Sequence, residues 1–114
     1  MSTPTTSERD ESTHEIYAEG TPLTELFGNG PKVKILAAFL ADPDFDHNVT
    51  DISRLAGVTR KTVYKHLDDL LELGVVEKTR ETGGSPRYKL DKDNEAAKLL
   101  GQLEWELIDL AFEE

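Results

Sequence analysis

The sequence of 114 residues predicts an α+β domain that is mostly helical. Between residues 31 and 74, three segments carry apolar residues at helical spacing, and glycine or turn residues separate them. After Gly74 the pattern changes to β-branched residues in partial alternation around Gly83-Gly84, which is typical of a hairpin. We therefore expect the helices to be followed by a two- or three-stranded sheet and then by a C-terminal helix.

Residues 50–74 are expected to form two helices joined by a tight turn. Thr50 is the expected cap of the first helix, and Gly57 ends it because glycine adopts the left-handed conformation without steric cost. Thr59 caps the second helix, and Gly74 ends that one. The apolar faces of the two helices consist of Ile52, Leu55, Ala56, Val63, Leu67, Leu70 and Leu71. This pattern predicts a helix-turn-helix.

The outward face of the second helix carries basic and polar side chains, namely Arg60, Lys61, Thr62 and Lys65, with Tyr64 at its flank. Cations at a helix N-terminus oppose the helix dipole by roughly 0.3–1 kcal/mol each. A phosphate backbone lying across this end would reverse the sign of that effect. The alternative is a solvated basic face that contains a Lys65–Asp69 ion pair.

The run Ala56-Gly57-Val58-Thr59-Arg60-Lys61-Thr62-Val63-Tyr64-Lys65-His66-Leu67, continued by Leu70-Leu71-Glu72-Leu73-Gly74-Val75-Val76, resembles the helix-turn-helix of winged-helix transcriptional regulators such as the MarR and ArsR groups. The resemblance covers residues 32–90. It implies a winged helix-turn-helix domain over residues 21–92 that binds double-stranded DNA, with recognition helix 59–73 in the major groove. The chain lacks the metal-binding cysteines of many ArsR members, because it contains no cysteine.

The hairpin of residues 75–90 would be the wing, with a turn over residues 82–86. Arg80, Arg87 and Lys89 flank the tip, with Ser85 in the turn, and they are candidates for contacts with phosphate or the minor groove. The alternative is a polar hairpin with ordinary strand-edge charges. The Gly83-Gly84 pair lacks the spacing of a phosphate-binding loop, so a nucleotide site is not expected.

The N-terminal part is expected to be a disordered acidic tail over residues 1–20, because it has almost no apolar residue to bury. Thr21 should cap a short helix whose apolar face is Leu23, Leu26 and Phe27. The helix from Pro31 to about Ala41 is apolar nearly all round and should be the central core helix. Residues 47–49 are expected to form a short first strand. His47 lies near Asp44 and Asp46, but no metal site is expected there.

The last helix, over residues 93–114, should start at a cap on Asp93 or Asn94. Its apolar residues recur at spacings of four and three, which is typical of a helix–helix seam: Ala96, Leu100, Leu103, Leu107 and Leu110. We expect this seam to be the interface of a homodimer. The alternative is a single broad face that packs on the chain's own core.

The formal charge is −10, and only residues 58–90 have a positive balance, with seven bases and five acids. The acidic excess resembles proteins of halophilic archaea, where molar salt screens charges beyond about 3 Å. An ordinary acidic protein with a protein partner is the alternative. No apolar run is long enough to cross a membrane and no signal pattern is visible, so the expected location is cytoplasmic.

Sequence-specific binding of double-stranded DNA by a dimeric transcriptional regulator is therefore the expected function. The alternative is a winged-helix module for protein–protein interaction in a larger complex. An enzyme is not expected, since there is no cysteine, the three histidines are scattered and no pair of catalytic carboxylates is visible. No catalytic residue, metal or cofactor is expected. The sequence identifies neither the operator nor a small-molecule effector.

Overall fold

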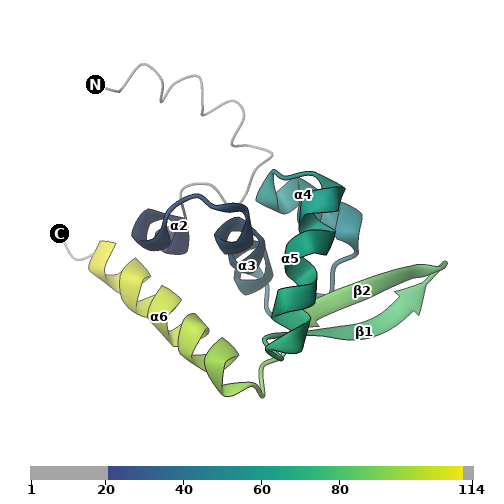
Figure 1. The fold of residues 1–114 in the computed structure, drawn as a ribbon. Helices are drawn as coiled ribbons and strands as arrows, with labels where there is room; N and C mark the ends of the chain where they lie inside the picture. The colour runs from purple at the N-terminus through teal and green to yellow at the C-terminus, as the bar shows by residue number, and fades with distance from the viewer. Residues whose placement is uncertain (1–20, 112–114) are drawn as a thin grey trace.

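The computed structural model describes residues 21–111. Its elements are α2 (Pro22–Phe27), α3 (Pro31–Ala41), α4 (Val49–Ala56), α5 (Arg60–Glu72), β1 (Val76–Thr82), β2 (Ser85–Leu90) and α6 (Glu95–Ala111). Figure 1 shows α3, α4 and α5 packed together, with the hairpin projecting to one side and α6 on the other. This is the α+β arrangement that the sequence predicts. The expected tail over residues 1–20 and the end of the last predicted helix lie outside the described residues.

Helix α3 is the centre of the core, as its apolar sequence predicts. Ile35 and Phe39 are fully buried, and α3 packs mainly against α4, with further contacts to α2, α5 and β2. In contrast, α2 contributes only Leu23 to the core cluster. Leu26 and Phe27 are 52% and 58% exposed, so the predicted apolar face of this helix is wrong at these two positions. At about 100° per residue the three side chains share one side of the helix, but only Leu23 reaches the core cluster.

The first helix of the helix-turn-helix is capped by Asn48, which corrects the expectation of Thr50. The Asn48 side chain accepts a hydrogen bond from the Asp51 backbone N–H at 2.8 Å. The Asp51 carboxylate in turn accepts one from the Asn48 backbone N–H at 3.4 Å, which completes a capping box. Thr50 is exposed inside the helix. Because the helix starts at Val49, the predicted strand over residues 47–49 is reduced to a single bridge at His47.

The remaining boundaries of the helix-turn-helix follow the sequence. Gly57 ends α4 in the left-handed conformation, with φ 71°. Thr59 caps α5, where its hydroxyl accepts a hydrogen bond from the Thr62 N–H at 3.2 Å. Val63, Leu67 and Leu70 are buried, so α5 presents one apolar face to the core.

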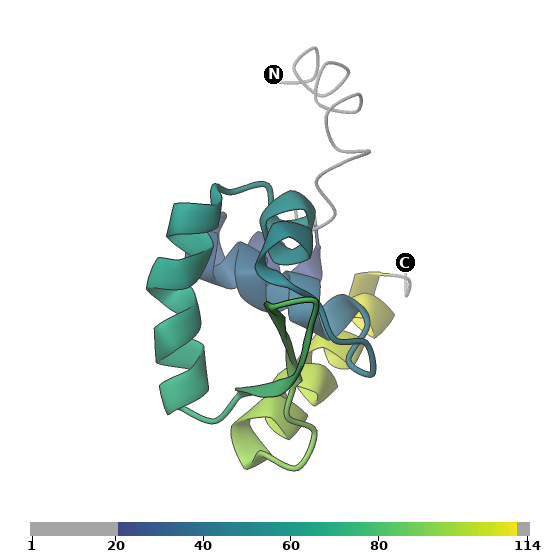
Figure 2. The same cartoon turned by 90° about the vertical axis from the view of Figure 1, so that its right-hand side faces the viewer.

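Strands β1 and β2 pair antiparallel, and we call residues 76–90 the wing (Figure 2). Gly83 and Gly84 form the turn with φ values of 58° and 81°, which few residues other than glycine adopt. Ser85 and Pro86, predicted as turn residues, belong to β2. His47 adds an isolated bridge to Tyr88, so the third strand is a single residue.

Asn94 joins the end of α5 to the start of α6. Its side-chain oxygen accepts a hydrogen bond from the Ala97 N–H at 2.9 Å, which caps α6 as expected. Its side-chain nitrogen donates to the Leu73 carbonyl at 3.3 Å, beyond the last turn of α5. The direction in which α6 leaves the domain is therefore fixed at its first turn.

Candidate nucleic-acid interface

The exposed face of α5 is formed by the residues expected from the sequence. Arg60, Lys61, Tyr64 and Lys65 are exposed, and Tyr64 retains 49% of its accessible surface. Thr62 is half-buried, and its hydroxyl lies 2.9 Å from the hydroxyl of the cap residue Thr59. Thr62 is therefore partly engaged in holding the start of the helix, and the other four side chains lie open to a partner.

The cations of this face differ from most of the others by lacking an acidic partner. Within residues 21–111, ion pairs engage Lys32, Arg54, Lys78, Arg80, Arg87, Lys92 and Lys98. Arg60, Lys61 and Lys65 form none of the ion pairs in this part of the chain, and the same holds for Lys34 and Lys89. Most of these uncompensated cations thus lie on the first two turns of α5.

Asp69, which was considered as an ion-pair partner for Lys65, is paired with another lysine. Asp69 forms an ion pair with Lys32 of α3 at 2.8 Å, and both side chains are about half exposed. The hydrogen bond and charge of Lys32 hold the pKa of Asp69 below its ordinary value. The Lys65–Asp69 alternative is therefore wrong, and Lys65 remains available.

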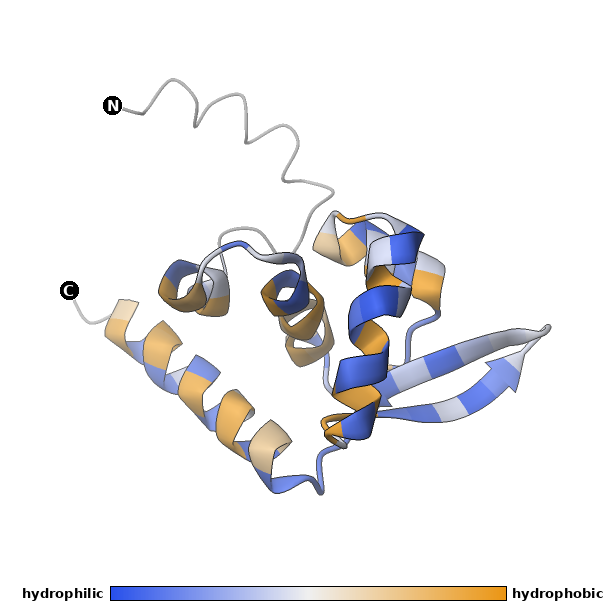
Figure 3. Ribbon diagram, viewed as in Figure 1, coloured by the Kyte–Doolittle hydropathy of each residue, from blue (hydrophilic) through white to orange (hydrophobic). Residues whose placement is uncertain are grey.

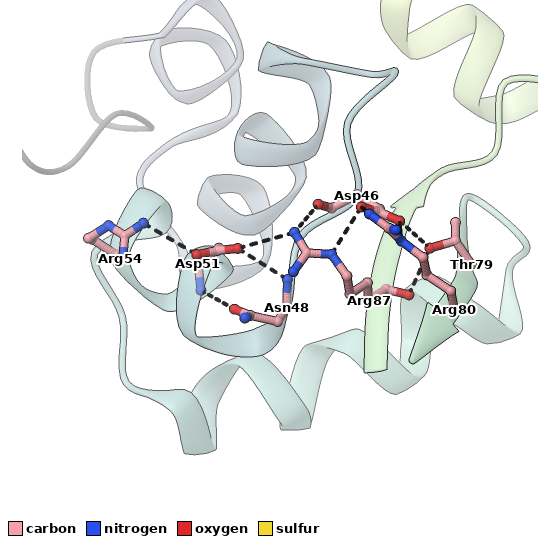
Figure 4. Close-up of polar contacts among 7 residues, drawn as sticks. All are labelled: Asp46, Asn48, Asp51, Arg54, Thr79, Arg80 and Arg87. Atoms are coloured by element: carbon pink, nitrogen blue, oxygen red, sulfur yellow. Dashed lines mark hydrogen bonds and ion pairs between the residues drawn. The ribbon is translucent and has the colours of Figure 1, made fainter. Parts of the chain in front are cut away.

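At the base of the wing, one carboxylate binds both arginines (Figure 4). Arg80 donates to the two Asp46 oxygens at 2.9 and 3.1 Å, and Arg87 donates from Nε at 3.0 Å. Arg87 also donates to the Asp46 backbone carbonyl at 2.8 Å, and Thr79 donates its hydroxyl proton to the carboxylate at 2.7 Å. The Arg80, Thr79 and Arg87 hydrogen bonds hold the pKa of Asp46 far below its ordinary range.

Arg87 was expected at the tip of the wing as a contact for DNA, but these contacts hold its side chain against Asp46. Its side chain is only 16% exposed, and it also lies 3.8 Å from the Asp51 carboxylate. Arg80 is 63% exposed but is engaged by the same Asp46. Lys89 is half-buried, and Ser85 is exposed beside the turn. Of the four predicted wing contacts, only Ser85 and Lys89 therefore lack a strong internal partner.

His47 supports the base of the wing from inside. Its ring lies between Phe39 and Phe45, at centroid distances of 6.1 and 4.9 Å, and the residue is 6% exposed. Burial lowers its pKa, although Asp51 and Asp42 act in the opposite direction. Its Nε2 has no hydrogen-bond partner. Burial of this kind favours the neutral ring.

The sequence did not indicate that Asp46 binds the two wing arginines, and this residue was considered only as a neighbour of His47. The sequence gives a weak signal for its role, since an acid precedes a short extended segment and two arginines occur on the later hairpin.

His47, Asp44 and Asp46 do not form a metal site. Among the residues that the structure describes, no cluster of histidines and carboxylates is placed to hold a metal ion.

Helix α6 packs on the domain with one face and exposes another. Ala97 is buried, and Leu100 and Leu103 pack half-buried against the core cluster. Leu99 and Leu110 are each 62% exposed, and Trp105 is 67% exposed. Figure 3 shows that hydrophobic residues recur along the whole length of α6.

An apolar groove of about 480 Å³ separates α6 from the C-terminal half of α5 and the start of α3. Leu73 and Leu99 are exposed at this groove, and Leu70 and Leu103 lie deeper within it. In the predicted seam, Leu103 therefore touches the chain's own core and also borders an open apolar surface. Ala96 is exposed, and Leu107 is half-buried.

Comparison with known proteins agrees with this architecture. Residues 32–78 match the model of the family described as bacterial regulatory protein, arsR family, and this segment runs from α3 into β1. Among curated protein sequences, none is similar enough to the chain to count as a relative.

Solved structures share the fold at low identity. The DNA-binding protein Sso10a-2 from Sulfolobus solfataricus is 22% identical with a TM-score of 0.51, over 68% of this chain and 78% of that one. A MarR-family transcriptional regulator from Silicibacter pomeroyi is 23% identical with a TM-score of 0.55, over 81% of this chain. The chain spans 65% of the length of that regulator.

The fold and the match of its central segment give the chain a winged helix-turn-helix domain. No helix among residues 21–111 is both long and apolar enough to cross a membrane.

Proposed function

We propose that the chain binds double-stranded DNA in a sequence-specific manner, as a dimeric transcriptional regulator. The observation that carries the proposal is the set of uncompensated cations on α5, Arg60, Lys61 and Lys65. Arg60 and Lys61 lie in the first turn of a helix whose dipole they oppose, so these two cations destabilise the free protein slightly. Phosphate lying across this end would be attracted both by the cations and by the helix N-terminus.

In this proposal, α5 lies in the major groove. Arg60 or Lys61 reads guanine, where a good bidentate contact gives about 1–3 kcal/mol of discrimination. Lys65 contacts phosphate one turn further along the helix. The exposed ring of Tyr64 contacts sugar or a thymine methyl group.

The wing, residues 76–90, lies on the DNA backbone or in the minor groove. Its contacts come from Lys89, Ser85 and the backbone of the glycine turn, where a Cβ on either glycine would meet open space. Arg80 and Arg87 take a supporting role instead, because both guanidinium groups are already bound by the Asp46 carboxylate. This assignment differs from the simplest interpretation of the sequence, in which both arginines contact DNA directly.

The dimer forms through the exposed apolar surface of α6. At about 100° per residue, Leu99, Leu103 and Leu110 lie within roughly 40° of one another around the helix. Ala97 lies more than about 100° away from this stripe and faces the core, so the helix has two apolar faces. Specific sites usually need two half-sites about one helical turn apart, and a two-fold dimer supplies them.

The test combines site selection with salt dependence. Duplex sites are selected from a random library with the full chain, and their affinity is measured by fluorescence anisotropy over a range of salt. Three α5 cations on each of two protomers predict that log K falls with log salt with a slope of about −5. A folded chain that enriches no site at any salt concentration refutes the proposal.

A second candidate function is a module for protein–protein interaction. The exposed Leu99, Trp105 and Leu110 on α6 favour it, because large apolar side chains grouped on one element mark interaction surfaces. The same selection experiment separates the two candidates. A folded chain that enriches no duplex site would favour the protein-binding module.

A further inference from the structure

The outer part of the wing has no core of its own. Along β1 only Val76 is buried, and the six residues that follow it are exposed. On β2 the buried residues are Tyr88 and Leu90, near the base. A two-stranded hairpin without such support is marginally stable in water. Buried side chains anchor the base of the wing, and polar contacts where it meets the helices restrain the direction of its outer part.

The register of the hairpin creates an electrostatic problem at this place. Arg80 and Arg87 lie directly opposite each other across the two strands. Like charges in directly opposed positions destabilise a hairpin. The Asp46 carboxylate removes the conflict, because it accepts hydrogen bonds from both guanidinium groups at once. Pairs of this kind are charge-assisted and directional.

The same cluster continues into the helix-turn-helix. Arg87 reaches from Asp46 to within 3.8 Å of Asp51, which belongs to the capping box of α4. Asp46 itself immediately precedes His47, whose backbone pairs with Tyr88. Asp46 thus connects both strands of the wing with the segment that positions α4.

We propose that Asp46 is a positioning residue that holds the wing at a fixed angle to α5. It thereby fixes the distance between the base contacts of α5 and the DNA contacts of the wing. The proposal rests on the proposed DNA-binding function. It goes further, because a residue that does not touch DNA would then affect which sequences the protein prefers. Removing the Asp46 carboxylate should reduce the preference for the selected sequence, even though it leaves the charges of the two wing arginines uncompensated.

The test compares Asp46→Asn with Asp44→Asn in the full chain. Both variants remove one negative charge from the same turn, but Asp44 pairs with Lys92, and Lys89 of the wing acts on it only through its charge. Amide hydrogen exchange is measured first, without DNA. Asp46→Asn should exchange about tenfold faster over residues 77–89, whereas Asp44→Asn should match the wild type. Equal exchange rates in the two variants would overturn the proposal.

DNA binding is the second measurement. At a temperature well below the thermal midpoint of each variant, the preference for a selected site over mixed-sequence DNA should fall about tenfold in Asp46→Asn, and Asp46→Glu should recover part of it. Tighter binding to both DNAs would mean that Asp46 restrains two DNA-binding arginines, which overturns the positioning role. Faster exchange with an unchanged preference would also overturn it.

If Asp46→Asn does not fold, Arg80→Gln replaces it, since this side chain is 63% exposed and its loss leaves the core intact. A wild-type chain that selects no DNA refutes the proposed function and with it the effect of Asp46 on sequence preference. The exchange rates then still decide whether Asp46 holds the wing.

Discussion

His47 and Tyr88 exchange both of their backbone hydrogen bonds, each at 2.8 Å. This single residue pair joins the connection between α3 and α4 to the second strand of the wing. The His47 ring is buried at the same point, with an unpartnered Nε2. The attachment of the wing therefore depends on a side chain that can acquire a charge near neutral pH.

This burial predicts a loss of stability on mild acidification. Because the pKa of His47 is lower in the folded chain than its ordinary value of 6.5, the unfolded chain binds the proton more tightly. The contribution of neutral His47 to the free energy of unfolding is therefore complete above about pH 6.5, and it is lost as the pH falls below that value. The paired Asp46 and Asp69 have lowered pKa values and lose their contribution only at more acidic pH.

Urea denaturation of the wild type and of His47→Phe between about pH 7.5 and pH 5 measures this effect. Phenylalanine retains the aromatic packing and the backbone bridge but cannot be protonated. The variant should lose the pH dependence that His47 contributes. Parallel stability curves for the two proteins would contradict the assignment.

The capping box predicts different costs for two neighbouring polar residues. Asn48→Ala should lower the free energy of unfolding by about 0.5–2 kcal/mol, since it removes the acceptor for the Asp51 N–H. Thr50→Ala should change it by less than about 0.5 kcal/mol, because Thr50 is exposed inside the helix. Both values come from urea denaturation at neutral pH, and a larger cost at Thr50 would restore it as the cap.

The free cations of α5 predict a selective loss of DNA binding. Lys61→Ala and Lys65→Ala should each weaken binding to a selected site, and the salt slope should become less steep by about one unit for each phosphate that the lysine neutralises. Lys98→Ala on α6 serves as the matched control, since it removes the same charge from an exposed site on another element. Anisotropy titrations at several salt concentrations give both quantities. Unchanged affinity in both α5 variants would remove α5 from the interface.

The two faces of α6 predict opposite outcomes for adjacent leucines. Leu99→Glu should convert the dimer to a folded monomer, because Leu99 is 62% exposed beside the groove. Leu100→Glu should lower the thermal midpoint strongly, because Leu100 packs against the core. Sedimentation at high salt and circular dichroism distinguish the two effects. A wild-type monomer at tens of micromolar would refute the dimer.

The sequence predicts the elements well because each is specified locally. Thr59 and Asn94 cap the helices where a polar residue precedes an apolar pattern, and the glycine pair marks the turn of the wing. The cap of α4 is harder to predict because Asn48 and Thr50 both satisfy the local rule. The capping box decides between them, since Asp51 lies three residues after Asn48.

The position of the wing arginines could not be predicted in this way. Arg87 and its partner Asp46 are 41 residues apart, and no local pattern connects them. The same is true of Lys32 and Asp69, which are 37 residues apart and leave Lys65 without its expected partner. Periodicity identifies which side chains share a face, but ion pairs between distant elements decide which cations remain available.

Trp105 gives the chain a built-in optical probe. It is the single tryptophan of the sequence, it lies on α6, and it is 67% exposed. It lies beside Leu90 and Ala97, on a different side of α6 from the groove residue Leu99, and no other indole obscures its fluorescence. Any partner that covers this side of α6 will shift the emission of the unlabelled protein to the blue, so occupancy of the helix can be followed in solution as conditions change.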